Sequence, residues 1–219
     1  MTVLLEGFHA VKHALRFAPD LVEAVLVRDL DEARGLAGRL APDITEQLLG
    51  RAVVGTVDHP TGVRGTARRP VEDRSVLARR DTPLVLLDDP RHPGNAGAVV
   101  RVAAAAGASG VAVTGRLDPW HPAVLRGSAG LHYALPVLAV DASEVSGPLL
   151  VLDADGDDLT TVGDDAVLVV GSERAGVGPE LRARADGVVR LPMRDGVSSL
   201  NLATATAAVL YAWRLGRPA

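Results

Sequence analysis

The 219-residue sequence contains no cysteine and very few aromatic side chains. Without cysteine the chain can form neither disulfides nor thiolate metal sites, and it has no cysteine nucleophile. Phe, Trp and Tyr make up 3% of the residues, so the core must be built from aliphatic side chains. Val, Leu and Ala are abundant, a composition typical of sheets covered by helices. The expected fold class is therefore α/β.

Long hydrophobic runs are also missing. No run approaches the roughly 20 apolar residues that are needed to cross a bilayer, so we expect no membrane contact. The amino-terminal sequence MTVLLEGFHAVKH lacks the basic and apolar regions of a secretion signal. These two absences predict a cytoplasmic protein.

Lysine is nearly absent, since arginine outnumbers it 22 to 1. The net charge of −4 argues against a polyanionic partner, but the charge is unevenly distributed. Residues 1–80 carry 12 basic side chains against 11 acidic ones, whereas residues 81–219 carry 11 against 16. The basic side chains gather in residues 64–80, which form either a phosphate-contacting strip or a solvated linker with the general arginine bias. The arginines of this strip are Arg64, Arg68, Arg69, Arg74, Arg79 and Arg80.

The apolar pattern predicts two domains, a small α/β domain over residues 1–75 and a larger domain over residues 80–219. Residues 59–70 are rich in Pro, Gly and Arg and show little periodicity, so they predict a boundary or a mobile loop. In the small domain the spacing predicts a helix over 3–18, a strand over 21–27, a helix over 31–40, a helical turn over 45–49 and a strand over 52–57.

From residue 83 onward, short apolar runs alternate with helical segments. Such runs are buried on both faces, which predicts a mostly parallel sheet. Ligands of these sheets bind at the carboxyl ends of the strands. The segments that follow the apolar runs are therefore the candidates for function.

The first of these segments contains Asn95, Gly97, Arg101 and Gly107. Asn95 is suited to cap a helix, Gly97 leaves room above the first turn, and Gly107 suits the carboxyl end. Arg101 lies among small and aliphatic residues, so it needs an anionic partner or access to a cleft. A structural ion pair is the alternative, with Asp88, Asp89 or Glu173 as its partner.

The second segment, residues 169–176, is an apolar strand that runs into a small-residue loop with one carboxylate, Glu173. Glycines at a strand end let the backbone approach a ligand closely. The third segment, residues 191–201, leads into a long small-residue helix. Ser198 or Ser199 can cap that helix, and Asn201 is expected in its first turn.

Other patterns were weighed against binding roles. His9 and His13 have a metal-ligand spacing but no third ligand, so we expect no metal. Residues 153–158 resemble a fragment of a calcium loop with a misplaced glycine, and a strand-end loop is the better interpretation. For Trp120, His121 and Tyr133, packing is favoured over stacking on bases.

Taken together and in this order, the three segments resemble the three motifs of the SpoU/TrmH-type RNA 2′-O-ribose methyltransferases of the SPOUT superfamily. The matching strings are N-x-G-x-x-x-R-x-A-x-x-x-G, G-S-E-x-x-G and P-M-x-x-G-V-x-S-L-N, between residues 84 and 215. The string R-x-S-A-G from Arg126 resembles a connecting element of the family. The string E-G-x-H-A-V from Glu6 resembles the start of its small ribosomal-protein-like substrate-binding domain.

The resemblance implies a SPOUT-type sheet with a carboxyl-terminal trefoil knot, a homodimer, S-adenosylmethionine as the cofactor, and ribosomal or transfer RNA as the substrate. Arg101 matches the position of the family's proposed proton acceptor. Catalytic roles are implied for Asn95, Arg101, Glu173, Ser199 and Asn201. Cofactor binding is implied for Ala154, Gly171, Gly176, Leu191, Met193, Ser199 and Leu200. The candidate RNA-binding residues are Arg64, Arg68, Arg69 and Arg126.

Three alternatives stay open at this point. The chain can be an antibiotic-resistance methyltransferase that acts on ribosomal RNA. It can also be an RNA-binding or ribosome-assembly factor that has lost catalysis, although such a protein has no need of all five predicted catalytic residues. A chance match to an α/β nucleotide-binding protein is the third, and a test of cofactor binding distinguishes it.

Overall fold

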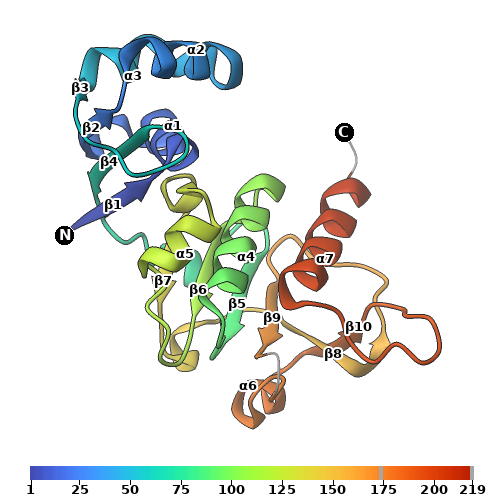
Figure 1. The fold of residues 1–219 in the computed structure, drawn as a ribbon. Helices are drawn as coiled ribbons and strands as arrows, with labels where there is room; N and C mark the ends of the chain where they lie inside the picture. The colour runs from blue at the N-terminus through green and yellow to red at the C-terminus, as the bar shows by residue number, and fades with distance from the viewer. Residues whose placement is uncertain (173–174, 218–219) are drawn as a thin grey trace. The chain divides into compact units, whose positions relative to one another are not determined.

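The computed structural model describes residues 1–172 and 175–217. The chain divides into two compact units, each of which contains helices and a sheet (Figure 1). It passes between the two units three times, because a short middle segment belongs to the first unit. The first unit comprises Met1–Val71 and Ser128–Ala134, and the second comprises Glu72–Gly127 and Leu135–Ala219.

The first unit has a four-stranded sheet in the order β1-β4-β2-β3. Strands β2 and β3 are parallel, and the other neighbours are antiparallel. The strand expected over 21–27 and the helix expected over 31–40 are both confirmed. The elements are β1 Thr2–Glu6, α1 Phe8–Phe17, β2 Val22–Val27, α2 Leu30–Leu40, α3 Thr45–Arg51, β3 Ala52–Val54 and β4 Val63–Arg68.

The helix predicted over residues 3–18 is wrong in its first third, because residues 2–6 form the strand β1. Val3 and Leu5 are buried while Leu4 is exposed, which is the alternation of a strand with one face packed on the core and the other toward solvent. Gly7 then takes a φ of +83°, a backbone conformation that favours glycine, and α1 begins at the next residue. The apolar residues on both sides of Gly7 happen to share a helical spacing, although Gly7 separates a strand from a helix.

The loop predicted over residues 59–70 is also wrong, because it contains the central strand β4. Val63, Gly65 and Ala67 point to the buried face, and Arg64 and Arg68 point outward. A Cβ atom at Gly65 would lie 3.2 Å from Val11 Cγ2 of α1 and 2.8 Å from the Ala24 carbonyl oxygen. Close packing under α1 therefore requires the small residues that suggested a loop.

The segment Ser128–Ala134 packs on α1 of the first unit. A Cβ atom at Gly130 would lie 2.8 Å from Ala10 Cα, so the two backbones are in direct contact. The His13 Nδ1 atom lies 2.8 Å from the Ala129 carbonyl oxygen, and the Tyr133 hydroxyl donates a hydrogen bond to the Arg68 carbonyl. The segment is thus an integral part of the first unit.

The second unit has a six-stranded sheet in the order β10-β8-β9-β5-β6-β7. Every neighbouring pair is parallel, which confirms the expected α/β fold with a mostly parallel sheet. The strands are β5 Leu84–Asp88, β6 Gly110–Val113, β7 Val137–Ala139, β8 Leu149–Asp158, β9 Val167–Gly171 and β10 Gly187–Arg190. The helices are α4 Pro93–Ala106, α5 Pro122–Gly127, α6 Pro179–Ala183 and α7 Leu202–Gly216.

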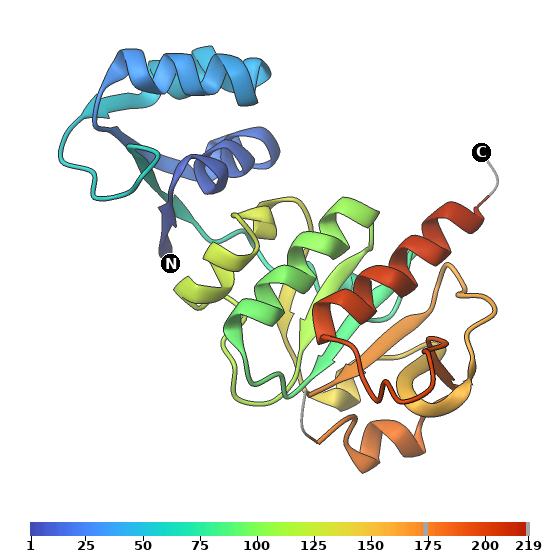
Figure 2. The same ribbon diagram turned by 45° about the vertical axis from the view of Figure 1, so that its right-hand side comes forward.

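Helices cover both faces of this sheet. Helices α4, α5 and α7 pack on one face over a core that includes Val85 and Leu87, and α6 packs on the other over Leu84 and Leu86. Helices α4 and α7 lie side by side in both views (Figures 1 and 2). Within the described part of the chain, we find no helix with the length and apolarity to cross a bilayer.

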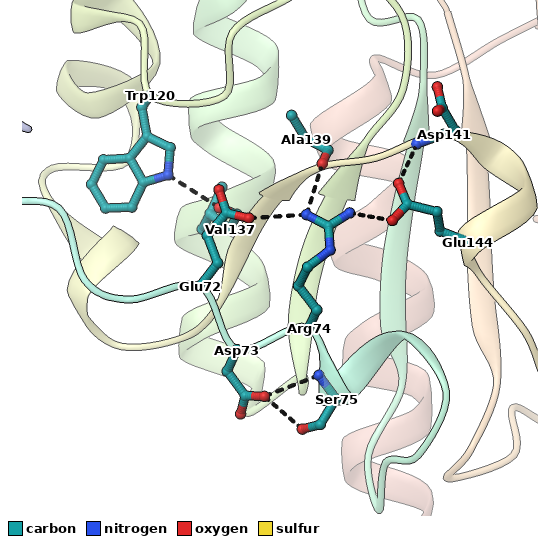
Figure 3. Close-up of polar contacts among 9 residues, drawn as sticks. All are labelled: Glu72, Asp73, Arg74, Ser75, Trp120, Val137, Ala139, Asp141 and Glu144. Atoms are coloured by element: carbon teal, nitrogen blue, oxygen red, sulfur yellow. Dashed lines mark hydrogen bonds and ion pairs between the residues drawn. The ribbon is translucent and has the colours of Figure 1, made fainter.

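Arg74, a member of the predicted phosphate-contacting strip, is held inside the second unit (Figure 3). Its guanidinium donates to the carboxylates of Glu72 at 2.9 Å and Glu144 at 2.5 Å. Arg80 likewise donates to backbone carbonyls, among them that of Asp165 at 2.8 Å. These two arginines are therefore engaged in packing the segment that follows Val71.

The Glu144 contacts predict a pH dependence of stability. The backbone N–H of Asp141 and the Arg74 guanidinium lower the pKa of the Glu144 carboxyl. A folded-state pKa below the unfolded one gives stability that is full above the unfolded value, about 4.3, and is lost as the pH falls. Between about pH 5 and pH 3, Glu144→Gln is therefore expected to lose less stability than the unmutated chain. Urea midpoints measured across this range, with the exposed Glu180→Gln as control, check this, and parallel losses in all three proteins would contradict it.

Candidate active site

A cavity of about 440 Å³ opens at the carboxyl edge of the second unit's sheet. Its walls come from the ends of β8 and β9, the segment after β10 and the start of α7. The volume lies within the range of small-molecule and cofactor sites, roughly 300–1,000 Å³. The cavity occupies the edge of a parallel sheet at which ligands bind.

All seven residues that were predicted to bind the cofactor line this one cavity. They come from three separate parts of the chain, which the parallel strands bring to one edge. Their role in binding stays a prediction, but their convergence is a structural fact. The seven are Ala154, Gly171, Gly176, Leu191, Met193, Ser199 and Leu200.

Backbone contacts close the wall at the end of β9. The backbone groups of Ser172 and Gly176 exchange two hydrogen bonds of 3.0 Å. A Cβ atom at Gly171 would lie 2.0 Å from the Gly176 carbonyl carbon and 2.3 Å from its oxygen. Only glycine fits at position 171, so the wall is built from main chain with no side chain between.

Helix α4 begins three residues earlier than expected, at Pro93. Pro93 occupies the first turn, for which its fixed φ and missing N–H are suited, and His92 precedes it as the cap residue. Asn95 therefore lies inside the first turn, and the prediction that it caps the helix is wrong. Gly107 ends α4 in the left-handed conformation, as predicted.

Gly97 has a different role from the one predicted. A Cβ atom there would lie 2.4 Å from the Val124 carbonyl oxygen and 2.8 Å from Gly127 Cα. The glycine thus allows α5 to cross α4 in close contact. It does not leave open space above the first turn.

Helix α7 is capped by Asn201, and the prediction of a Ser198 or Ser199 cap is wrong. The Asn201 Oδ1 atom accepts hydrogen bonds from the backbone N–H groups of Ala203 and Thr204. Its Nδ2 atom donates to Asn95 Oδ1 at 3.1 Å. The amide of Asn201 is thereby oriented, and it joins the first predicted segment to the third.

Arg101 lies on α4 with its side chain exposed, and it does not line the cavity. The structural ion pairs considered for it do not form with the two aspartates, because Asp88 accepts from Thr114 and Gly178 and Asp89 pairs with Arg91 at 2.7 Å. Glu173 lies outside the described residues, so neither its catalytic role nor a pair with Arg101 is tested. Among the residues described, the guanidinium of Arg101 has no hydrogen bond or ion pair.

Several polar residues of the cavity wall were not predicted. Asp153, Ser172, Arg190 and Ser198 line the cavity, and Asp153 forms an ion pair with Arg182. For Asp153 the signal is an acid directly after an apolar strand, and the family resemblance already implies that residues 153–158 lie at the mouth of the cofactor site. The prediction of a strand-end loop over residues 153–158 is wrong, because these residues belong to β8. The register between β8 and β10 shifts there: Val188 of β10 pairs with Val151, and the next residue, Val189, pairs with Asp157.

The predicted RNA-binding arginines lie on both units. In the first unit, Arg64 and Arg68 point outward from β4, and Arg69 is half-buried. Arg68 donates to the Asp20 carbonyl and lies 3.8 Å from the Glu23 carboxylate. In the second unit, Arg126 is exposed in the last turn of α5.

Trp120 and Tyr133 pack as expected, whereas the packing predicted for His121 is wrong. The His121 side chain is exposed and accepts a local hydrogen bond from the Ala123 N–H. Trp120 is buried, and its Nε1 donates to the Val137 carbonyl at 3.1 Å (Figure 3). Tyr133 is buried as well, and burial raises the pKa of its hydroxyl.

In the described ranges, His, Asp and Glu side chains nowhere gather in a group of three or more that could hold a metal ion.

Fold and cavity together define an α/β protein that takes a ligand of cofactor size at the carboxyl edge of a parallel sheet. The sequence matches the model of the SpoU rRNA Methylase family over residues 82–211. This match covers more than half of the chain, so the protein belongs to the SpoU rRNA methylase family. The resemblance read from the three segments is thereby confirmed.

Two similar sequences have specific activities in their names. A 23S rRNA (uridine(2479)-2′-O)-methyltransferase of Streptomyces viridochromogenes is 32% identical over 190 residues, which cover 78% of this chain and 64% of the relative. The 23S rRNA (guanosine(2553)-2′-O)-methyltransferase RlmP of Bacillus subtilis (strain 168) is 29% identical over 225 residues, which cover 96% and 87%. The chain thus spans just under two thirds of the first relative and most of the second.

Solved structures agree on the fold. The crystal structure of the SpoU methyltransferase AviRb from Streptomyces viridochromogenes, in complex with the cofactor AdoMet, has a TM-score of 0.78 at 28% identity and covers 96% of this chain and 88% of that chain. The crystal structure of an RNA 2′-O ribose methyltransferase has a TM-score of 0.73 at 28% identity and covers 96% and 86%.

Proposed function

We propose that this protein transfers a methyl group from S-adenosylmethionine to a ribose 2′-hydroxyl of RNA, with ribosomal RNA as the favoured substrate. The observation that carries this proposal is the single cavity that gathers all seven predicted cofactor residues, with Asn201 joining it to Asn95 of α4. The family match and the two named 23S rRNA 2′-O-methyltransferases support the same reaction.

The residues of the cavity fit S-adenosylmethionine. Leu152, Leu191 and Met193 supply apolar surface, while the main chain at Gly171 and Gly176 approaches without side chains in between. Such a wall can hold an adenine ring and pair its edge with backbone groups. The bound cofactor supplies an activated methyl group on a sulfonium.

The protein's own contribution is position and charge. Arg101 carries a guanidinium, which has hydrogen-bond donors but no acceptor, so it is a poor base. Its charge can orient a substrate phosphate and stabilise the alkoxide that develops on the ribose oxygen. Asn95 and Asn201, joined by their hydrogen bond, would orient the ribose toward the cavity.

Binding of the RNA strand is assigned to both units. We propose the first unit as the substrate-binding domain, with Arg64, Arg68 and Arg69 contacting phosphates, and Arg126 doing so in the second unit. Such contacts position an RNA without reading its sequence. With ribosomal RNA as the substrate, we expect the protein in the cytoplasm. Weaker RNA binding in all four alanine variants, measured by filter retention, checks the assignment.

We also propose a homodimer and a carboxyl-terminal trefoil knot. Helix α7 exposes a row of apolar residues three and four positions apart, Ala208, Tyr211, Ala212 and Leu215, the last of which is 81% exposed. Such a row is typical of a helix that packs against a partner. Light scattering tests the dimer, and the backbone course in a crystal structure tests the knot.

The deciding experiment measures transfer of labelled methyl from S-adenosylmethionine to purified, unmodified ribosomal RNA and transfer RNA, supplied separately. Nuclease digestion then identifies the labelled nucleoside. Label in a 2′-O-methylnucleoside of ribosomal RNA is the expected result. Tight cofactor binding without label in either RNA would instead favour a binding-only assembly factor.

A further inference from the structure

Asp88 is the last residue of β5, at the centre of the six-stranded sheet. Its neighbour across the ladder is Gly171, the last residue of β9. The carboxylate does not line the cavity, so it does not touch a ligand bound there. Both of its oxygens nevertheless accept hydrogen bonds from other parts of the second unit.

The two oxygens of Asp88 accept hydrogen bonds from two different sides. Oδ1 accepts from the Thr114 hydroxyl at 2.8 Å, directly after β6. Oδ2 accepts from the Gly178 backbone N–H at 2.7 Å, directly before α6. A charged acceptor strengthens both bonds relative to neutral pairs. One side chain thus ties the carboxyl ends of β5 and β6 to the chain that returns from β9.

Gly178 lies two residues beyond the wall of the cavity. The main chain at Gly176 rests against Gly171, and its hydrogen bonds with Ser172 close the wall. A Cβ atom at Gly178 would lie 3.1 Å from Asp88 Oδ2, so this point is also tightly packed. The bond to Asp88 is therefore the anchor on the far side of the wall.

We propose that Asp88 is a positioning residue for cofactor binding, because it fixes the main chain from Gly176 to Gly178 against the end of β9. The inference rests on the proposed function, since it takes S-adenosylmethionine as the occupant of the cavity. Fixed backbone groups bind a ligand more tightly because less order has to be imposed on binding. Loss of the Asp88 hydrogen bond leaves the main chain of the cavity wall less ordered. S-adenosylmethionine then binds more weakly, although Asp88 itself makes no contact to it.

The test compares Asp88→Ala with a matched control, Asp186→Ala. Asp186 accepts a hydrogen bond from the Leu149 backbone N–H at 2.8 Å. Leu149 is the first residue of β8, so the control lies at the amino ends of the strands, away from the cavity at their carboxyl ends. Both variants lose a bond between a carboxylate and the backbone. Calorimetric titration with S-adenosylmethionine and thermal unfolding without it are measured for each.

Asp88→Ala is expected to raise the dissociation constant by about tenfold, while Asp186→Ala leaves it unchanged. Both variants are expected to unfold at lower temperature. An unchanged dissociation constant in Asp88→Ala overturns the inference. Failure of the unmutated chain to bind S-adenosylmethionine would instead overturn the proposed function, so the two failures are distinguishable.

Two conservative variants keep the test valid if Asp88→Ala does not fold. The Asp88→Asn amide can still accept from Gly178 and donate to the Thr114 hydroxyl, whereas Asp88→Glu keeps the charge but shifts it by one methylene. The proposal requires tighter cofactor binding in Asp88→Asn than in Asp88→Glu. The reverse order shows that charge matters and not position, and overturns it.

Discussion

Replacement of Arg101 by alanine is expected to reduce methyl transfer by about a thousandfold and to leave the affinity for S-adenosylmethionine nearly unchanged. The guanidinium lies outside the cavity wall and, among the described residues, is not held by an ion pair. It is therefore available to the RNA and not to the cofactor. Single-turnover transfer rates and calorimetric dissociation constants, measured on the same preparations, separate the two effects.

Two further variants make the Arg101 result specific. Arg101→Lys keeps a positive charge but loses the planar fork of donors, so partial activity is expected if charge alone matters. Arg214→Ala is the matched control, because Arg214 is an exposed helical arginine of the same unit that donates to the Ala106 carbonyl. Its turnover should stay close to that of the unmutated chain. Normal turnover in Arg101→Ala would falsify the assignment of Arg101.

Gly171→Ala is expected to weaken S-adenosylmethionine binding by about a hundredfold or more, which corresponds to about 2.8 kcal/mol. The added methyl carbon would lie 2.0 Å from the Gly176 carbonyl carbon and 2.3 Å from the Val177 nitrogen. Both neighbours are main-chain atoms, so no side-chain rotation relieves the overlap. The wall of the cavity has to move, and its contacts to the ligand are lost.

Gly163→Ala is the control for this variant. Position 163 is exposed in the same unit, and there an added Cβ would meet only the Asp165 side-chain oxygen at 3.2 Å, which can rotate away. Its dissociation constant should match that of the unmutated chain, and its unfolding temperature should change little. Equal affinity in Gly171→Ala and Gly163→Ala would show that the wall at Gly171 does not shape the binding site.

The second unit was predictable from the sequence because its strands are buried on both faces. A strand such as β5, with four successive buried apolar residues, stands out without any alternation. The carboxyl ends of such strands meet at one edge, so the segments after them were identified together. The first unit has one-sided strands that contain glycine and arginine, and in β4 these residues indicated a loop.

Local capping was predicted less well than the convergence of the three segments on one cavity. Asn95 and Ser199 are both good cap residues, but Pro93 suits a first helical turn and Asn201 is as good a cap as Ser199, so the sequence offers competing starts for each helix. The pair between Asn95 and Asn201 joins residues 106 positions apart, so only the packing of α4 against α7 reveals it. The sequence offers Asp88 as a possible partner of Arg101. Its hydrogen bond with Gly178 cannot be predicted in the same way, because it depends on the course of the chain between β9 and α6.

The division of the chain into units limits how the protein can be dissected. A fragment that ends near residue 80 would lack Ser128–Ala134, and α1 would lose the backbone that packs against Ala10. The second unit cut at the same place would carry that segment without the α1 surface on which it packs. Because the chain passes between the units three times, no single cut of the main chain separates them into complete fragments.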